Sequence, residues 1–508
     1  MRREVQGLKV FPALDALLML IILNFTLQPL TEPDFGWHLR TGLDLLQHGG
    51  ILPALDPYSH TMPDWPWVEH AWLTDLIIGT CYSLFGASGV IVFFAVVTAG
   101  AWLVASLSAP CGRTYRLLAC ALSLWVGLPF LGARTQMVTL LGLAVLLVML
   151  QQSKRSKNGE NRALWLIPPL FLLWANLHGG FTAGLFLLGL VAACSAIVTG
   201  VVLRAPGLAA RLDEAILSWP AIRGLVAAAA VAAVVTLVNP YGWRLYGEII
   251  DSLSNRFMLD SLQEWQPLSL NSLAGRGYAL YLLGLGMAMV AWYRRIEPVR
   301  WVLWIVFLFL SLRHMRNIPF FLLVSLPLCA ELLAEGLGRL IGRLSLDSAS
   351  ARRYVLAGTL AGGVLMVWLG PDHLQRVAQS GLQPGEYFKG TSYPIEAVQW
   401  VREHRDRVGS RLYNDYAYGG FLVWWLPEEK IFIDGRMPAW RSGDRRIFED
   451  YVALSLTDPP SLSILSAYSV DWAIVKKKSL LDEALSREQT WRRKYEDEKV
   501  SIYVQRRE

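Results

Sequence analysis

The stretch VFPALDALLMLIILNFTLQPLTEPDFGWHLRTG, residues 10–42, decides the class of protein. Its first 21 residues, Val10 to Leu30, are predominantly apolar, and a helix of roughly 20 such residues crosses a bilayer. No small-residue cleavage site follows the run, so we expect a retained helix with a cytoplasmic N-terminus. Residues 31–71 then form the first outer loop. The basic residues that precede the run are Arg2, Arg3 and Lys9.

Similar apolar runs recur as far as Leu369 in a chain of 508 residues, of which 54% are hydrophobic and only 17% are charged. This composition excludes a soluble enzyme, a disordered chain and a coiled coil. Basic clusters between the runs mark the cytoplasmic side of the membrane. Residues 384–508 carry 20 basic and 20 acidic side chains, so the net charge of +6 lies upstream, where it marks topology. We therefore expect the lipid bilayer as a partner and no nucleic acid.

The apolar runs predict an α-helical polytopic membrane domain over residues 1–371, with about eleven transmembrane helices. Because residues 31–71 are expected outside and the basic cluster that follows residue 110 inside, the chain should cross the membrane once between residues 72 and 110. Two apolar stretches lie there, separated by Gly86-Ala87-Ser88-Gly89. We therefore expect residues 72–85 to form a short, partly inserted helix.

Residues 372–508 change character and predict an extracytoplasmic α/β domain. The segment from Ile395 to His404 has helical spacing, and three short apolar stretches predict strands. These stretches are Arg411 to Asn414, Lys430 to Asp434 and Val470 to Val475. Asp415, Asp434 and Arg436 are candidates for binding a carbohydrate or an acceptor. The alternative is that Asp434-Gly435-Arg436 forms a turn after a buried strand.

The first outer loop gathers ionisable side chains, which are costly at membrane depth and are therefore candidates for function. Residues 35–48 predict an amphipathic helix with Asp34, His38 and Thr41 on one face. Asp34 is either a functional carboxylate or the cap of this helix. Later in the loop, Glu69 and His70 lie among three tryptophans, which are functional neighbours or anchors at the membrane interface.

Other predicted outer helix ends contribute further polar side chains. Taken singly, each is explained as a helix terminus or as a cation that extends to the interface; taken together, they could enclose a cavity. Guanidinium groups bind phosphate oxygens bidentately, so arginines in this position indicate a phosphate-bearing ligand. The residues are Arg134, Asn176, His178, Arg313 and Arg316.

Short elements in a fixed order run along nearly the whole chain. They are Glu32-Pro33-Asp34, Trp37-His38-Leu39, Asp56-Pro57-Tyr58-Ser59, Trp174-Ala-Asn-Leu-His-Gly-Gly180, Asn414-Asp-Tyr-Ala-Tyr-Gly-Gly420 and Phe432-Ile-Asp-Gly-Arg436. This set resembles the GT-C superfamily of integral-membrane glycosyltransferases, most closely bacterial members related to the aminoarabinose and protein-O-mannosyl transferases. The chain departs from that group in having Glu69-His70-Ala71-Trp72-Leu73 where a Lys-Pro-Pro or His-Pro-Pro element is expected. This departure argues against lipid-phosphate binding by a lysine.

The resemblance implies transfer of a sugar from a polyprenyl-phosphate-linked donor to an acceptor, at the outer face of a bacterial inner membrane. It implies Asp34 as the general base, with Glu32 assisting it or joining it in binding Mg²⁺ or Mn²⁺. The sugar pocket would be lined by Asn176 and His178. The residues that would bind the substrate or its lipid phosphate are His38, Glu69, His70, Arg134, Arg313 and Arg316.

Two other functions stay open. A transporter of lipids or anionic solutes would use the same outer Arg and His side chains, but it would favour internal repeats and broken helices near the membrane midplane. A catalytically inactive subunit would keep a GT-C scaffold for binding or assembly. Replacement of Asp34 separates these functions, because only an enzyme should lose turnover.

Overall fold

The computed structural model describes residues 12–155, 162–204, 217–343 and 372–506. Within them the chain forms two compact units, each built from separate parts of the sequence. The helical unit comprises residues up to 28, 94–242 and 262–375. The mixed unit comprises residues 29–93, 243–261 and 376 onward. Three features of the sequence lie outside the described residues: the basic residues before the first run, the run that ends at Leu369, and the predicted domain boundary after residue 371.

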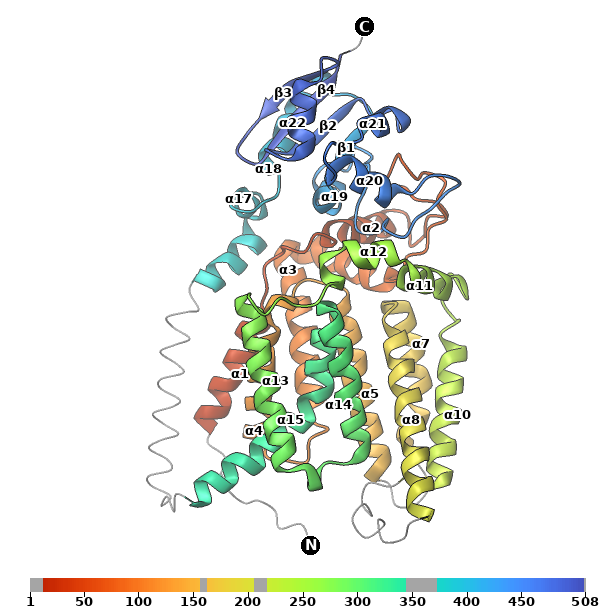
Figure 1. The fold of residues 1–508 in the computed structure, drawn as a ribbon, viewed down its shortest axis with the longest axis vertical. Coiled ribbons are helices and arrows are strands. Elements are labelled where there is room, and N and C mark those ends of the chain that lie inside the picture. The colour runs from red at the N-terminus through yellow and green to blue at the C-terminus, as the bar shows by residue number, and fades with distance from the viewer. Residues whose placement is uncertain (1–11, 156–161, 205–216, 344–371, 507–508) are drawn as a thin grey trace. The chain divides into compact units, whose positions relative to one another are not determined.

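Long apolar helices dominate the helical unit (Figure 1). Five described helices are long and apolar enough to cross a membrane, and three shorter helices are also apolar, so the chain is a multi-pass membrane protein. The five spans lie in α3 (Trp72–Ser106), α5 (Gln136–Arg155), α8 (Phe181–Arg204), α13 (Leu273–Ala291) and α15 (Ile318–Arg343). The shorter ones lie in α1 (Pro12–Thr26), α7 (Ile167–Leu177) and α10 (Trp219–Val235). The total of about eleven crossings stays a prediction.

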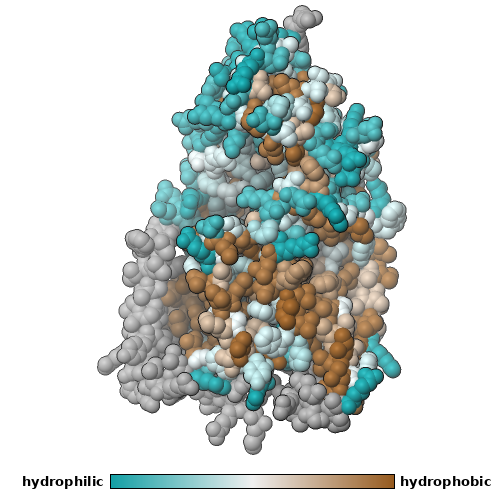
Figure 2. Space-filling model, in the orientation of Figure 1, coloured by the Kyte–Doolittle hydropathy of each residue, from teal (hydrophilic) through white to brown (hydrophobic). Residues whose placement is uncertain are grey.

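The helices of this unit pack along one another. α4 (Arg113–Gly127) packs against α1 and α15, α10 packs against α7 and α8, and α14 (Pro298–Arg313) packs against α8 and α15. Phe171 and Trp174 are fully buried, whereas Leu173 and Phe309 are exposed. Figure 2 shows apolar residues over much of the surface of these helices. Such a surface is costly in water, and lipid is the solvent that suits it.

Helix α3 is interrupted at Gly86, whose φ of 63° and ψ of −160° are not helical. Glycine adopts this backbone conformation without strain, whereas a residue with a Cβ does not. The predicted division of the segment at Gly86 is therefore found. Residues 72–85 belong to the mixed unit, whose first segment ends at Phe93. Their partial insertion into the membrane stays a prediction.

The tail of the mixed unit forms a four-stranded sheet in the order β1-β2-β4-β3 (Figure 1). β1 (Leu412–Asn414) runs parallel to β2 (Trp472–Lys476), and β4 (Val500–Gln505) runs antiparallel to β2 and to β3 (Trp491–Glu496). Helices α18 (Ile395–Glu403) and α22 (Leu480–Arg487) pack against the sheet. A small mixed α/β fold in the tail is therefore confirmed. The other helices of the tail are α17 (Pro384–Lys389), α19 (Gly419–Trp425), α20 (Ile447–Ser455) and α21 (Ser463–Ala467).

The strand predicted over Lys430 to Asp434 is wrong. Ile431 makes only an isolated parallel bridge to Ser59, and the N–H of Phe432 donates to Oδ1 of Asn414 at 2.8 Å. The first loop and one amide side chain therefore satisfy backbone groups that a neighbouring strand would otherwise satisfy. The buried apolar run is extended without belonging to the sheet.

The first loop and an internal segment complete the mixed unit. The loop forms α2 (Phe35–Gln47), close to the helix predicted over residues 35–48, and α19 packs against it. The internal segment forms α11 (Arg244–Ser254) and α12 (Arg256–Ser261). The loop that carries the candidate base is thus part of the same compact unit as the tail.

Candidate functional site

Asp34 immediately precedes α2, where the sequence allows either a functional carboxylate or a helix cap. Its φ of −82° and ψ of −15° are helical, and its side chain makes no capping hydrogen bond. A capping aspartate has extended backbone and accepts from the N–H groups of the first turn. The carboxylate instead accepts a hydrogen bond from Nε1 of Trp37 at 3.3 Å. Capping therefore does not explain this residue.

Within the mixed unit, the Asp34 carboxylate packs against Gly435. A Cβ at position 435 would fall 1.8 Å from Oδ1 of Asp34, so the carboxylate lies directly against the glycine. A second close approach joins the same parts of the chain, because a Cβ at Gly420 would fall 2.2 Å from the carbonyl oxygen of Pro33. Glycines of the tail therefore hold the turn that carries Asp34.

His38 and Asp75 meet where α2 lies against α3. The two backbones touch at Gly42, where a Cβ would fall 1.9 Å from the carbonyl oxygen of Asp75. With the helices this close, Nδ1 of His38 lies 2.7 Å from Oδ1 of Asp75. His38 stacks on Trp37, with ring centroids 3.5 Å apart. The imidazole is thus fixed on one side by a ring and on the other by a carboxylate.

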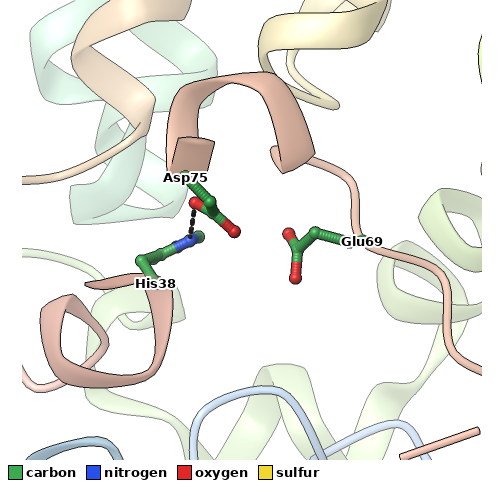
Figure 3. A group of neighbouring side chains, drawn as sticks. All are labelled: His38, Glu69 and Asp75. Atoms are coloured by element: carbon green, nitrogen blue, oxygen red, sulfur yellow. Dashed lines mark hydrogen bonds and ion pairs between the residues drawn. The ribbon is translucent and has the colours of Figure 1, made fainter. Parts of the chain in front are cut away.

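His38, Glu69 and Asp75 form a buried cluster (Figure 3), in which one donor atom from each residue lies within 4.8 Å of the others. Their exposed fractions are 5%, 2% and 0%. Oε1 of Glu69 accepts from the N–H of Ala71 at 3.0 Å. Figure 3 shows Oδ2 of Asp75 turned toward the Glu69 carboxylate, and this atom has no hydrogen-bond partner among the described residues. Glu32 and Asp34 are not members of this cluster.

Burial governs the charge of the cluster. It lowers the pKa of His38 to about 3, although Asp34 opposes the shift, so the imidazole is neutral at neutral pH. Burial also raises the pKa of Glu69 well above its usual value, and Asp75 adds to the effect. A negative charge at Glu69 is therefore costly unless a proton or a cation accompanies it. His70 is less buried, and its Nδ1 lies 3.9 Å from Oε1 of Glu69.

Arg436 is a buried cation beside this region. Nη1 donates to Oδ1 of Asp56 at 2.6 Å, and Nε donates to Oδ2 of Asp434 at 2.7 Å. The guanidinium also lies 4.8 Å from the ring centroid of Trp67 and 5.4 Å from that of Trp440. Burial disfavours its charge, but the two carboxylates outweigh burial and raise the pKa of Arg436. Because these charges are already paired, the structural interpretation of Asp434 and Arg436 is favoured over carbohydrate binding.

The remaining predicted site residues belong to the helical unit. His178 accepts at Nδ1 from the N–H of Gly180 at 2.9 Å, and the hydroxyl of Thr139 lies 2.7 Å from the same nitrogen. Since Nδ1 accepts, the proton of a neutral His178 sits on Nε2. Asn176 donates to the carbonyl oxygens of Leu172 and Val238, each at 2.9 Å, and so joins the ends of two helices.

The predicted arginines have different surroundings. Arg316 forms an ion pair with Glu264, and its guanidinium lies 5.1 Å from the ring centroid of Trp265. Arg313 is exposed at the end of α14, whereas Arg134 is half-buried just before α5. Among these three, Arg316 has its charge balanced by a carboxylate of its own unit. Binding of a lipid phosphate by Arg134, Arg313 and Arg316 stays a prediction.

Asp75 is the member of the cluster that is not among the residues predicted from the sequence. A carboxylate in the apolar stretch from Trp72 to Phe85 is costly in lipid and therefore a candidate by the same rule that selected the loop residues. Its partner His38 lies 37 residues earlier, and only the packing of α2 on α3 brings the two together. A single acidic residue in an apolar stretch is recognisable in the sequence, whereas the contact of Asp75 with His38 is not.

The sequence matches no protein-family model and no curated protein. The fold is similar to that of the Archaeoglobus fulgidus oligosaccharyltransferase. The structure tethered with an acceptor peptide containing the NVT sequon matches over 92% of this chain and 69% of that one, with 11% identity and a TM-score of 0.55. The apo form matches over 91% and 69%, with 11% identity and a TM-score of 0.52. The described residues therefore share the fold of that membrane oligosaccharyltransferase.

Proposed function

We propose that the chain transfers a sugar from a polyprenyl-phosphate-linked donor to an acceptor at the outer face of the membrane. The observation that carries the proposal is the position of Asp34 on a glycosyltransferase fold: it is half-buried, held by Trp37 and Gly435, and not used as a cap. A base of this kind must face the reacting atoms from a fixed position. The fold supplies the reaction class by analogy, and the site supplies the residue.

In this reaction the acceptor hydroxyl attacks the anomeric carbon while Asp34 takes its proton. The bond from that carbon to the phosphate oxygen breaks, and the polyprenyl phosphate leaves with the electron pair, which inverts the anomeric centre. We assign stabilisation of the leaving phosphate to His70, Arg134 and Arg313, because cationic donors bind phosphate oxygens. Glu32 assists Asp34, and Asn176 and His178 contact the sugar. We also infer that the first loop and the tail lie outside the cell, because the basic loops are predicted inside it.

Asp34→Asn tests this proposal, because an amide keeps the shape of the carboxylate and cannot accept the proton. The purified protein is incubated with polyprenyl-phosphate-linked sugars, and release of polyprenyl phosphate and lipid binding are both measured. We expect loss of general-base catalysis to lower turnover by about 10²- to 10⁴-fold while lipid binding is kept. Asp44→Asn, in the helix that Asp34 precedes, is the matched control. Equal turnover in wild type and Asp34→Asn contradicts the assignment, and lipid binding without turnover in the wild type favours a binding subunit.

A further inference from the structure

We propose that His38, Glu69 and Asp75 bind one divalent transition-metal ion. The site differs from the pair Glu32 and Asp34 that the sequence pointed to. The proposal concerns metal binding alone, so it does not depend on whether the chain transfers a sugar. The ion would join three segments of the mixed unit: α2, the end of the first loop and the start of α3.

The donor atoms already converge. They lie within 4.8 Å of one another, and ligands on opposite sides of an ion bound at about 2.1 Å are about 4.2 Å apart, so only a small closure is needed. Asp75 gives the independent sign of a ligand. Its side chain is fully buried, its Oδ2 has no hydrogen-bond partner among the residues described, and this atom faces Glu69 across the cluster (Figure 3). Buried polar atoms without partners are rare. Either a bound cation or a proton shared with Glu69 would satisfy Oδ2, and the titration below separates the two.

Charge balance favours a doubly charged ion. Two carboxylate ligands carry two negative charges and an imidazole ligand carries none, so a divalent ion leaves the buried site neutral. A monovalent ion would leave a net negative charge among buried side chains, which is costly. The nearby Arg436 guanidinium also acts on His38 and Glu69, but its own charge is paired with Asp56 and Asp434.

The ligand types indicate which ion fits. Carboxylate oxygens suit Mg²⁺, Ca²⁺ and Mn²⁺, whereas imidazole nitrogen suits Zn²⁺, Fe²⁺ and other transition metals. Mn²⁺ is common to both preferences, because it accepts oxygen ligands readily and also binds imidazole. A site of one histidine and two carboxylates therefore matches Mn²⁺ better than Mg²⁺, and Mn²⁺ is also visible by electron paramagnetic resonance.

The test uses the full-length protein purified in detergent, treated with a chelator and then titrated with Mn²⁺. The resonance signal of free Mn²⁺ gives the bound fraction, and pulsed measurements detect nitrogen coupled to the bound ion. We expect one Mn²⁺ per chain with coupling to one imidazole nitrogen, which His38→Gln abolishes. Because even outer-shell changes cost about 10- to 100-fold in affinity, Glu69→Gln and Asp75→Asn should each weaken binding at least about tenfold.

Asp44→Asn is the matched control, since Asp44 lies on α2 outside the cluster and bonds to Tyr58 at 2.8 Å. It should bind Mn²⁺ as the wild type does. Binding of neither Mn²⁺ nor Zn²⁺ at millimolar concentration overturns the proposal, and so does binding that Asp75→Asn leaves unchanged. Gel filtration reports whether each variant folds. Where a variant does not fold, the wild type decides alone, because bound Mn²⁺ without nitrogen coupling rules out His38 as a ligand.

Discussion

At position 435 the absence of a side chain is what leaves room for a carboxylate from the first loop. Oδ1 of Asp34 lies 1.8 Å from where a Cβ would stand. The contact joins residues 401 positions apart by number, so it depends on the assembled mixed unit and not on local geometry. The position of the Asp34 carboxylate is therefore set in part by a residue that has no side chain.

Gly435→Ala should displace the Asp34 carboxylate without changing its chemistry. If Asp34 is the base, turnover should fall by about 100-fold, the effect of a misplacement on the order of 1 Å. The initial rate of polyprenyl phosphate release measures this. Gly385→Ala is the control, because a Cβ there would meet its nearest atom, on Trp425, at an ordinary 3.8 Å. Wild-type turnover in Gly435→Ala would show that the position of the carboxylate is unimportant.

At the scale of the element, the packing of α2 on α3 assembles the cluster. The amphipathic pattern predicts α2 within one residue of its observed end, because polar and apolar positions alternate with the helical period. The same kind of pattern predicts α18, β1 and β2 in the tail. It does not predict that α2 lies against α3 at Gly42, since a pattern within one helix carries no information about which helix it meets.

Gly42→Ala should separate the two helices. The added methyl group would lie 1.9 Å from a backbone carbonyl, and overpacking of this kind costs about 1–3 kcal/mol. We expect a lower midpoint of thermal unfolding, measured in detergent by intrinsic tryptophan fluorescence. Gly247→Ala, in α11, is the control, because no atom lies within 4 Å of its added Cβ. There, the gain in helix propensity of up to about 1 kcal/mol should keep or raise the midpoint. Equal shifts in the two variants would argue against a tight crossing.

The failed strand at Lys430 to Asp434 shows a second limit of the sequence at this scale. An apolar run with β-branched residues has the composition of a buried strand, and residues 431–434 are indeed buried. Its backbone bonds go to Asn414 and to the first loop. Partners of that kind come from tertiary contacts, so burial was predictable and the sheet was not.

At the scale of the whole molecule, the two units alternate along the sequence. The mixed unit is assembled from residues 29–93, 243–261 and 376 onward, with parts of the helical unit between them. Composition predicts a membrane domain followed by a tail instead, because it changes only once along the chain. Hydropathy reports which residues meet lipid, whereas the packing of the first loop with the tail is set by single contacts such as Asp56 with Arg436.

Glu248 makes the stability of the molecule depend on pH. Burial, with a further effect of Asp251, raises its pKa from 4.5 to about 7. Between these values the folded state keeps a proton that the unfolded state releases, so stability falls as pH rises. The stabilisation of the folded state by the Glu248 proton is complete below about pH 4.5 and is lost as the pH rises through about 7. The thermal midpoint of the wild type should therefore fall relative to Glu248→Gln over this range.

Thermal unfolding in a series of buffers measures the effect of Glu248. Glu403→Gln, at an exposed position of α18, is the control and should follow the wild type at each pH. Parallel curves for the wild type and Glu248→Gln would show that the buried carboxyl holds no proton in this range.

The ion pair between Asp56 and Arg436 also orders events during synthesis of the chain. The two residues are 380 positions apart, and at about 5–20 residues per second the ribosome adds Arg436 roughly 20–80 s after Asp56. Until then burial of Asp56 would leave it without its arginine partner, which is costly. The first loop therefore reaches its final packing only after nearly the whole chain has been made, and a nascent chain that stops earlier exposes it.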